Sequence, residues 1–113
     1  MSGDLQAAWD ALAAQVLVRN LGVDRGKMMS ADALTWCGKV FAFYSIKGGQ
    51  EGMGCRLGRE FDIERLGLKD WQNFAPFKTR PPMKDWIVVG QGDLQHWPDV
   101  IQTALKIAQN RNS

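Results

Sequence analysis

The hydrophobic positions near the N-terminus recur with the spacing of a helix. Apolar side chains lie three or four residues apart at Leu5, Trp9, Leu12 and Val16, and the polar residues between them fall elsewhere on the helical wheel. Alanine is abundant in the same stretch and favours helix. The pattern predicts an amphipathic helix over residues 4–20, with Gly22 just beyond its end.

A second helical stripe lies near the end of the chain. Its apolar positions are Trp97, Ile101, Leu105 and Ala108. Pro98 stands where the helix would begin, and proline is favourable there because the missing N–H would have no helical partner. We expect a helix over residues 98–109, with this stripe on its inner face.

Between the two helical segments the pattern shortens to that of strands. Two apolar runs flank Cys37-Gly38, which is typical of a hairpin with a two-residue turn. In a type I′ turn Cys37 would adopt a left-handed conformation and expose its thiol. A reactive thiol beside Lys39 is then conceivable, but a tolerated substitution at a turn is the favoured explanation. The expected strands cover residues 34–36, 40–44, 53–57 and 86–89, with a weaker one at 26–29.

The region between the last two expected strands is less regular. Residues 61–68 fit a short helix that Gly67 would end, whereas residues 69–84 contain three prolines and fit a loop with at most edge pairing. Trp86 opens the apolar strand that follows, so its ring is expected to lie buried between sheet and helix.

These elements together predict an α+β fold. Hairpin-connected strands give an antiparallel sheet, and the N- and C-terminal helices can flank one face of it in two layers. The length of 113 residues suits a single domain over 1–113, and 45% hydrophobic residues suffice for a core.

No stretch approaches the ~18 consecutive apolar residues of a membrane span, and no targeting segment is visible. We therefore expect a cytoplasmic protein that does not associate with a membrane.

Few residues in the chain are suited to catalysis or metal binding. Two cysteines, Cys37 and Cys55, are too few for a disulfide framework, and with one histidine, His96, they do not match the spacing of a zinc site. His96 fits a helix cap or an exposed polar residue, and Cys55 a small buried hydrophobe. No set of nucleophile, base and orienting residue can be named, so we expect neither an enzyme nor a cofactor.

The most plausible binding surface lies in the proline-containing segment. Aromatic and methionine side chains alternate there with cations, a mixture that suits a protein interface. The alternative to a binding surface is a loop that packs its aromatic side chains onto the sheet and leaves its cations in solvent. The candidate residues are Lys69, Trp71, Phe77, Lys78, Arg80, Met83 and Lys84.

The charge distribution raises a second possibility. Residues 25–84 hold 11 Lys/Arg and 6 Asp/Glu, whereas the two flanks hold 3 and 6. A basic middle segment can bind nucleic acid, but a net charge of +2 is mild for that function. The sequence therefore predicts a non-enzymatic binding module whose partner is a protein, a second copy of the chain being one candidate. A nucleic-acid-binding regulatory domain is the alternative.

Three segments resemble a known family. Residues 26–29 (Gly-Lys-Met-Met), 38–42 (Gly-Lys-Val-Phe-Ala) and 80–89 (Arg-Pro-Pro-Met-Lys-Asp-Trp-Ile-Val-Val) look like the motifs of the TfoX N-terminal domain. The resemblance spans about residues 23–108. It implies a two-layer α+β domain related in architecture to YjbR-like proteins and secretion-chaperone-like folds. It implies little about chemistry: the family is named for a regulator of bacterial competence, and many of its members are single domains of unknown function.

Overall fold

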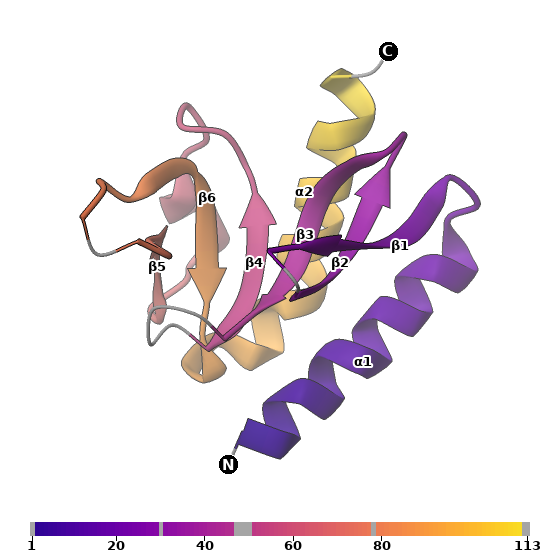
Figure 1. The fold of residues 1–113 in the computed structure, drawn as a ribbon, viewed down its shortest axis with the longest axis horizontal. Helices are drawn as coiled ribbons and strands as arrows, with labels where there is room; N and C mark the ends of the chain where they lie inside the picture. Colours follow the sequence, from indigo (N-terminus) through magenta and orange to yellow (C-terminus); the bar gives the residue numbers. More distant parts are fainter. Residues whose placement is uncertain (1, 30, 47–50, 78, 112–113) are drawn as a thin grey trace.

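The computed structural model describes residues 2–29, 31–46, 51–77 and 79–111. Helices α1 (Ser2–Arg19) and α2 (Trp97–Arg111) enclose the strands in the sequence (Figure 1). The strands are β1 (Val23–Met28), β2 (Ala31–Trp36), β3 (Lys39–Ser45), β4 (Gly52–Arg56), β5 (Trp71–Phe74) and β6 (Met83–Val89). Two short 3₁₀ helices, η2 (Ile63–Leu66) and η3 (Gln91–His96), precede β5 and α2.

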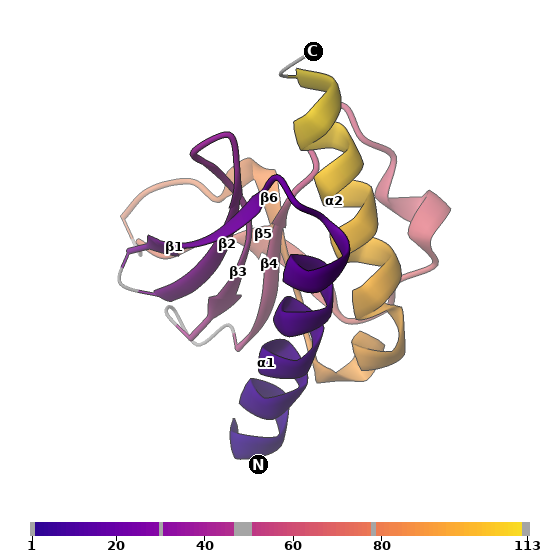
Figure 2. The ribbon, with the colours of Figure 1, turned by 90° about the vertical axis from the view of Figure 1, so that its right-hand side faces the viewer.

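The strands form one open antiparallel sheet. Their order is β1-β2-β3-β4-β6-β5, so β1 and β5 are the edges. Both long helices lie on the same side of the sheet (Figure 2). The predicted α+β class, with two layers and an antiparallel sheet flanked by terminal helices, is confirmed. Among the described residues, no helix combines the length and apolar character needed to cross a membrane.

The face of the sheet that contacts the helices, called here the helix face, carries the larger core. The apolar stripe predicted for the first helix is buried there, with Trp9 fully enclosed. Its indole N–H donates to the carboxylate of Asp32 at 2.8 Å, and Arg25 pairs with the same carboxylate at 2.8 Å. These contacts fix α1 onto the first hairpin. The predicted stripe of the last helix is buried as well at Trp97, Ile101 and Leu105.

The turn between β2 and β3 has the predicted type I′ geometry. Cys37 and Gly38 both have positive φ, 52° and 79°, and Cys37 is exposed at the tip. Further along, the register steps from Leu34 opposite Ala42 to Thr35 opposite Val40, so β3 contains one extra residue, Phe41. This β-bulge lets Phe41 and Ala42 both contact the helix-face core.

The opposite face, called here the open face, is buried without a helix. Its cluster comprises Ala33, Phe43, Phe74, Trp86 and Val88. The Phe43 ring meets Phe74 edge-on at 4.9 Å and Trp86 at 5.5 Å between ring centroids. It also lies over Gly54, where an added Cβ would come within 2.2 Å of the ring. The absence of a side chain at Gly54 therefore makes room for the aromatic cluster.

Three expectations need correction. Trp86 is buried in a strand as predicted, but it lies on the open face against Phe43, because its alternation in β6 points it away from the helices. The weak strand expected at 26–29 begins earlier, at Val23. The edge pairing allowed for residues 69–84 is present, because Trp71–Phe74 forms the edge strand β5, but the segment is not a loop up to residue 84, since β6 already begins at Met83.

Candidate functional site

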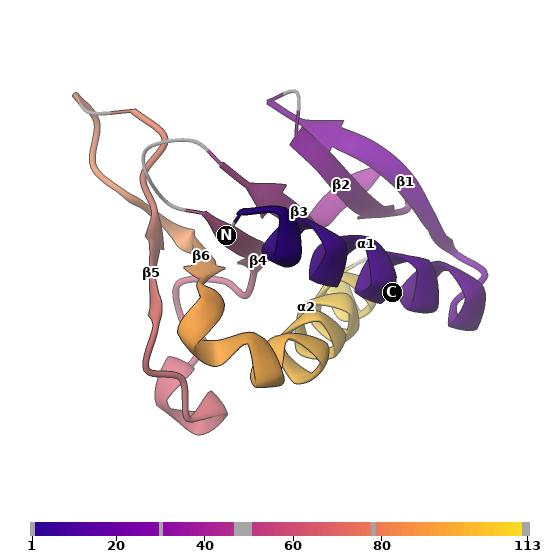
Figure 3. The same cartoon turned by 90° about the horizontal axis from the view of Figure 1, so that it is seen from below.

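The predicted binding segment forms a projecting hairpin, called here the arm and comprising residues 69–77 and 79–84. Seen from below in Figure 3, its connection between β5 and β6 extends away from the two helices. Six of the seven candidate residues lie on the arm, whereas Lys78 lies outside the described residues.

A buried carboxylate ties the base of the arm to η3. Asp93 is fully buried, and its Oδ2 accepts the backbone N–H groups of Lys69, at 2.8 Å, and of Asp70. The carboxylate of Asp70 in turn accepts the N–H of Gly92 at 2.8 Å, and its carbonyl accepts the N–H of Gly90 at 2.8 Å. The start of β5 is therefore held in one position. Nothing local in the sequence indicates that Asp93 is buried, so this contact was not predicted.

The pairing of the arm changes along its length. Trp71 stands opposite Val89 and Asn73 opposite Ile87, but the next pair joins Phe74 to Met83, so β6 bulges away from its partner. The side-chain amide of Asn73 donates to the carbonyl of Trp86 at 3.3 Å within this bulge. The bulge separates a regular base from an irregular tip.

The tip carries an exposed aromatic ring covered by a cation. Phe77 is 47% exposed, and the Arg80 guanidinium lies 5.3 Å from its ring centroid. The backbone N–H of Arg80 donates to the carbonyl of Phe77 at 3.4 Å, which closes a turn. Met83 is 37% exposed, and Lys84 beside it is exposed. Phe77, Arg80, Met83 and Lys84 thus belong to the tip.

Lys69 and Trp71 belong to the base instead. Trp71 is 37% exposed and lies three positions from Phe74 along β5, which corresponds to about 10 Å. The structure therefore divides the candidate residues between two ends of one hairpin. Phe74, an aromatic residue of the same segment, is buried in the open-face cluster and therefore does not add to the binding surface.

A groove of about 350 Å³ runs beside the tip. It is lined by Pro82, Met83, Lys84, Asp85, Trp86 and Arg59. Arg59 pairs with Asp85 at 3.4 Å, and its backbone N–H donates to the same carboxylate at 2.9 Å. Partial desolvation raises the pKa of Asp85, but the hydrogen bonds from Arg59 outweigh it and leave that pKa below its usual range. The negative charge of Asp85 is therefore already compensated by Arg59.

The other residues singled out in the sequence lie elsewhere. Cys55 is buried in β4, and burial raises the pKa of its thiol, while His96 is half-buried at the end of η3. Within the described ranges, no three His, Cys, Asp or Glu side chains gather closely enough to hold a metal ion.

No family model, curated protein or solved structure matches the chain. The resemblance to the TfoX N-terminal domain accordingly stays a prediction.

Proposed function

We propose that this chain is a non-enzymatic protein-interaction module whose arm contacts the partner. The observation that carries the proposal is the position of the exposed aromatics. Among the described residues, Trp71 and Phe77 are the exposed aromatic side chains, and Met83 lies on the same hairpin. Other exposed apolar residues, such as Val18 and Leu21, are aliphatic and belong to α1 and the turn after it. Aromatic residues, methionine and arginine are enriched at protein interfaces.

The arm is suited to binding because little of it needs to be ordered by a partner. Its base is held by Asp93, and Phe74 and Trp86 anchor its strands in the open-face cluster. At the tip, Arg80 already covers Phe77, and Pro81 and Pro82 restrict the backbone. A preorganised surface loses less conformational entropy on binding.

The charges of the arm indicate what kind of surface it would contact. The acidic residue of the arm and the one directly after it are already engaged: Asp70 with Gly92, and Asp85 with Arg59. Lys69, Arg80 and Lys84 are exposed, so the positive charge of the arm faces the solvent. The partner expected from this pattern is a protein with an apolar pocket surrounded by Asp or Glu side chains.

The alternative, nucleic-acid binding, is less well supported by the arrangement of the basic residues. Arg25 and Lys27 lie on β1, at the opposite edge of the sheet from Arg80 and Lys84. Two of the cations, Arg25 and Arg59, are paired with carboxylates. A nucleic-acid surface needs a continuous basic stripe that follows the phosphates.

Fluorescence anisotropy with labelled duplex and single-stranded DNA tests this choice. We expect weak binding or none at about 50 mM salt, whereas phosphate-driven binding would be strong there and fall steeply by about 200 mM. The variant Arg80→Glu/Lys84→Glu is compared with Arg65→Glu/Lys106→Glu, which reverses two exposed cations elsewhere. Submicromolar binding lost only in the first variant would replace the protein partner with nucleic acid.

The cellular setting and family belong to the same proposal. The free cysteines Cys37 and Cys55 suit a reducing compartment, which supports a cytoplasmic location. The likeness of residues 80–89 to the TfoX N-terminal domain supports a regulatory partner. These residues form the end of the arm and the strand β6.

A further inference from the structure

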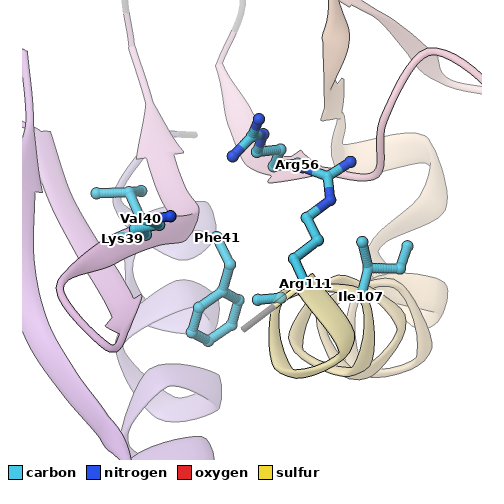
Figure 4. Close-up of a pocket in the computed structure, with 7 residues that line it drawn as sticks. Lys39, Val40, Phe41, Arg56, Ile107 and Arg111 are labelled. Atoms are coloured by element: carbon cyan, nitrogen blue, oxygen red, sulfur yellow. The ribbon is translucent and has the colours of Figure 1, made fainter. Parts of the chain in front are cut away.

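A cationic pocket lies on the helix side of the sheet, apart from the arm. It has a volume of about 150 Å³ and opens where the start of β3, the end of β4 and the last turns of α2 meet (Figure 4). Three cations and four apolar residues line it: Lys39, Arg56, Arg111, Val40, Phe41, Ile107 and Ala108.

The fold brings the three cations together from distant positions in the sequence. Lys39 directly follows the type I′ turn, Arg56 is the last residue of β4, and Arg111 is the last residue of α2. Figure 4 shows the Arg111 side chain reaching from α2 toward the strand end that carries Arg56. Its guanidinium also lies against Gly58, where an added Cβ would be 2.7 Å from Nη2. The pocket is thus a product of tertiary structure.

The positive charge of this pocket is not balanced by acidic residues. Among the described residues, no Asp or Glu lines it and none of its three cations lies within 4.0 Å of a carboxylate. The carbonyl end of α2 contributes a partial negative charge of about one half, which offsets only part of the total. The nearby Asp85 feels the charge of Arg56 but is already paired with Arg59. An excess of positive charge therefore remains.

The apolar wall strengthens the effect of this charge. Phe41 is buried, and Val40, Ile107 and Ala108 are half-buried around the cations. Beside such a surface the effective dielectric constant is lower than in water, so an anion is attracted more strongly and the cations repel one another more. Binding an anion would relieve this repulsion.

We propose that the pocket binds the phosphoryl group of a small phosphorylated molecule. A phosphate dianion matches three cations better than a monocarboxylate does, and guanidinium groups bind phosphate oxygens through paired hydrogen bonds. The volume is below the roughly 300 Å³ at which pockets enclose a whole drug-sized ligand. It accommodates a phosphoryl group with a small apolar substituent packed on the Ile107 side.

The experiment is an NMR titration of the intact ¹⁵N-labelled chain with phenyl phosphate, followed by inorganic phosphate and benzoate. Phenyl phosphate should produce saturable shifts in amides of residues 38–41, 55–58 and 107–111. Inorganic phosphate should bind at the same amides more weakly, because it lacks the apolar part. Benzoate should bind at least about tenfold more weakly than phenyl phosphate, since it carries half the charge.

Matched variants separate the pocket from general electrostatics. Arg56→Gln and Arg111→Gln should each weaken phenyl phosphate binding about tenfold, the effect of one charge-assisted contact. Arg111→Lys keeps the charge but loses the planar fork, so it should fall between wild type and Arg111→Gln. Lys106→Gln removes an exposed cation of α2 that does not line the pocket and should leave binding unchanged. The spectra themselves report whether each variant is folded.

Three results of these titrations would overturn the assignment. The first is the absence of saturable shifts, and the second is benzoate binding as tightly as phenyl phosphate. The third is equal weakening by Lys106→Gln and Arg56→Gln. A further titration compares a short oligonucleotide with and without a 5′-phosphate. If the phosphorylated oligonucleotide binds more tightly than phenyl phosphate through Arg56 and Arg111, the site belongs to nucleic-acid ends and the small-molecule proposal is wrong.

Discussion

The two faces of the sheet are buried in different ways. The helix face is covered by α1 and α2, whose apolar stripes supply Trp9, Trp97 and their neighbours. The open face is filled by side chains of the strands themselves, and its aromatic cluster depends on the room left at Gly54. The helix face is thus buried by a second layer of structure. The open face is buried by its own aromatic side chains, which use the space beside Gly54.

This difference bears directly on the proposed binding site. Phe74 and Trp86 belong to β5 and β6, the two strands of the arm, and both are buried in the open-face cluster. The helix face holds the sheet and the helices together, whereas the open face anchors the arm. Exposed aromatics at the tip and base are therefore supported by buried aromatics between them.

Removing one tryptophan from each face gives the largest expected effects. Trp9→Ala and Trp86→Ala should each destabilise the chain by about 3–5 kcal/mol, because each leaves a large cavity. Trp9→Ala also leaves Asp32 without its indole donor. Denaturant melts measure both changes.

The control for these melts is Trp71→Ala, which truncates an exposed tryptophan on the neighbouring strand. Its effect should be about 1 kcal/mol, well below the loss at Trp86, because more than a third of the Trp71 side chain is already in solvent. A loss below about 1 kcal/mol for Trp86→Ala would contradict the burial of the open face.

A smaller effect is expected from filling the space at Gly54. Gly54→Ala should cost about 1–3 kcal/mol, because Phe43 is held between Phe74 and Trp86 and cannot move aside. When Phe43→Leu is combined with Gly54→Ala, the added methyl group should cost less stability, because the smaller leucine leaves room for it. A double-mutant cycle by chemical denaturation measures the coupling, and strictly additive changes would show that Gly54 does not serve the aromatic cluster.

Alkaline pH acts on the helix face. Burial and a hydrogen bond to Glu51 raise the pKa of Tyr44, the one tyrosine of the chain. Because the folded-state pKa exceeds the unfolded value of about 10, the stabilisation is complete below pH 10 and is lost as pH rises toward the folded pKa. Stability should fall by up to about 1.4 kcal/mol per pH unit in that window.

Urea melts at several alkaline pH values, with phenolate absorbance as a direct readout, measure this dependence. Tyr44→Phe should reduce the slope without removing it, because burial raises the pKa of the Cys55 thiol in the same direction. An identical slope in wild type and Tyr44→Phe would contradict the burial of the phenol.

The helix face was largely predictable from the sequence. Residues Leu5, Trp9 and Val16 repeat with helical spacing, and that spacing alone determines which side of α1 is buried. The turn at Cys37-Gly38 was predictable for a similar reason, because two apolar runs flank a two-residue segment with glycine, and a type I′ turn needs positive φ at both of its central positions. In these cases the signal lies within a few neighbouring residues.

The open face and the arm were less predictable because they depend on strand pairing. Trp86 could point to either face, and only the register of β6 between β4 and β5 determines which. The strand β5 is too short to show a pattern, and its base is fixed by Asp93, which lies more than twenty residues further along the chain. The cationic pocket likewise combines Lys39, Arg56 and Arg111, whose proximity no local pattern indicates.

Site-specific photocrosslinking tests the central claim, that the arm binds a protein, most directly. A benzophenone amino acid replaces Phe77 at the tip or, as the control, Val18 on α1, which is exposed and apolar but distant from the arm. After irradiation in lysate of the native host, position 77 should yield a discrete protein adduct that position 18 does not. That adduct should disappear in an Arg80→Glu/Lys84→Glu background. A second copy of the chain as the crosslinked protein would also support the claim. Identical adducts from both positions, or nucleic acid as the crosslinked species, would contradict it.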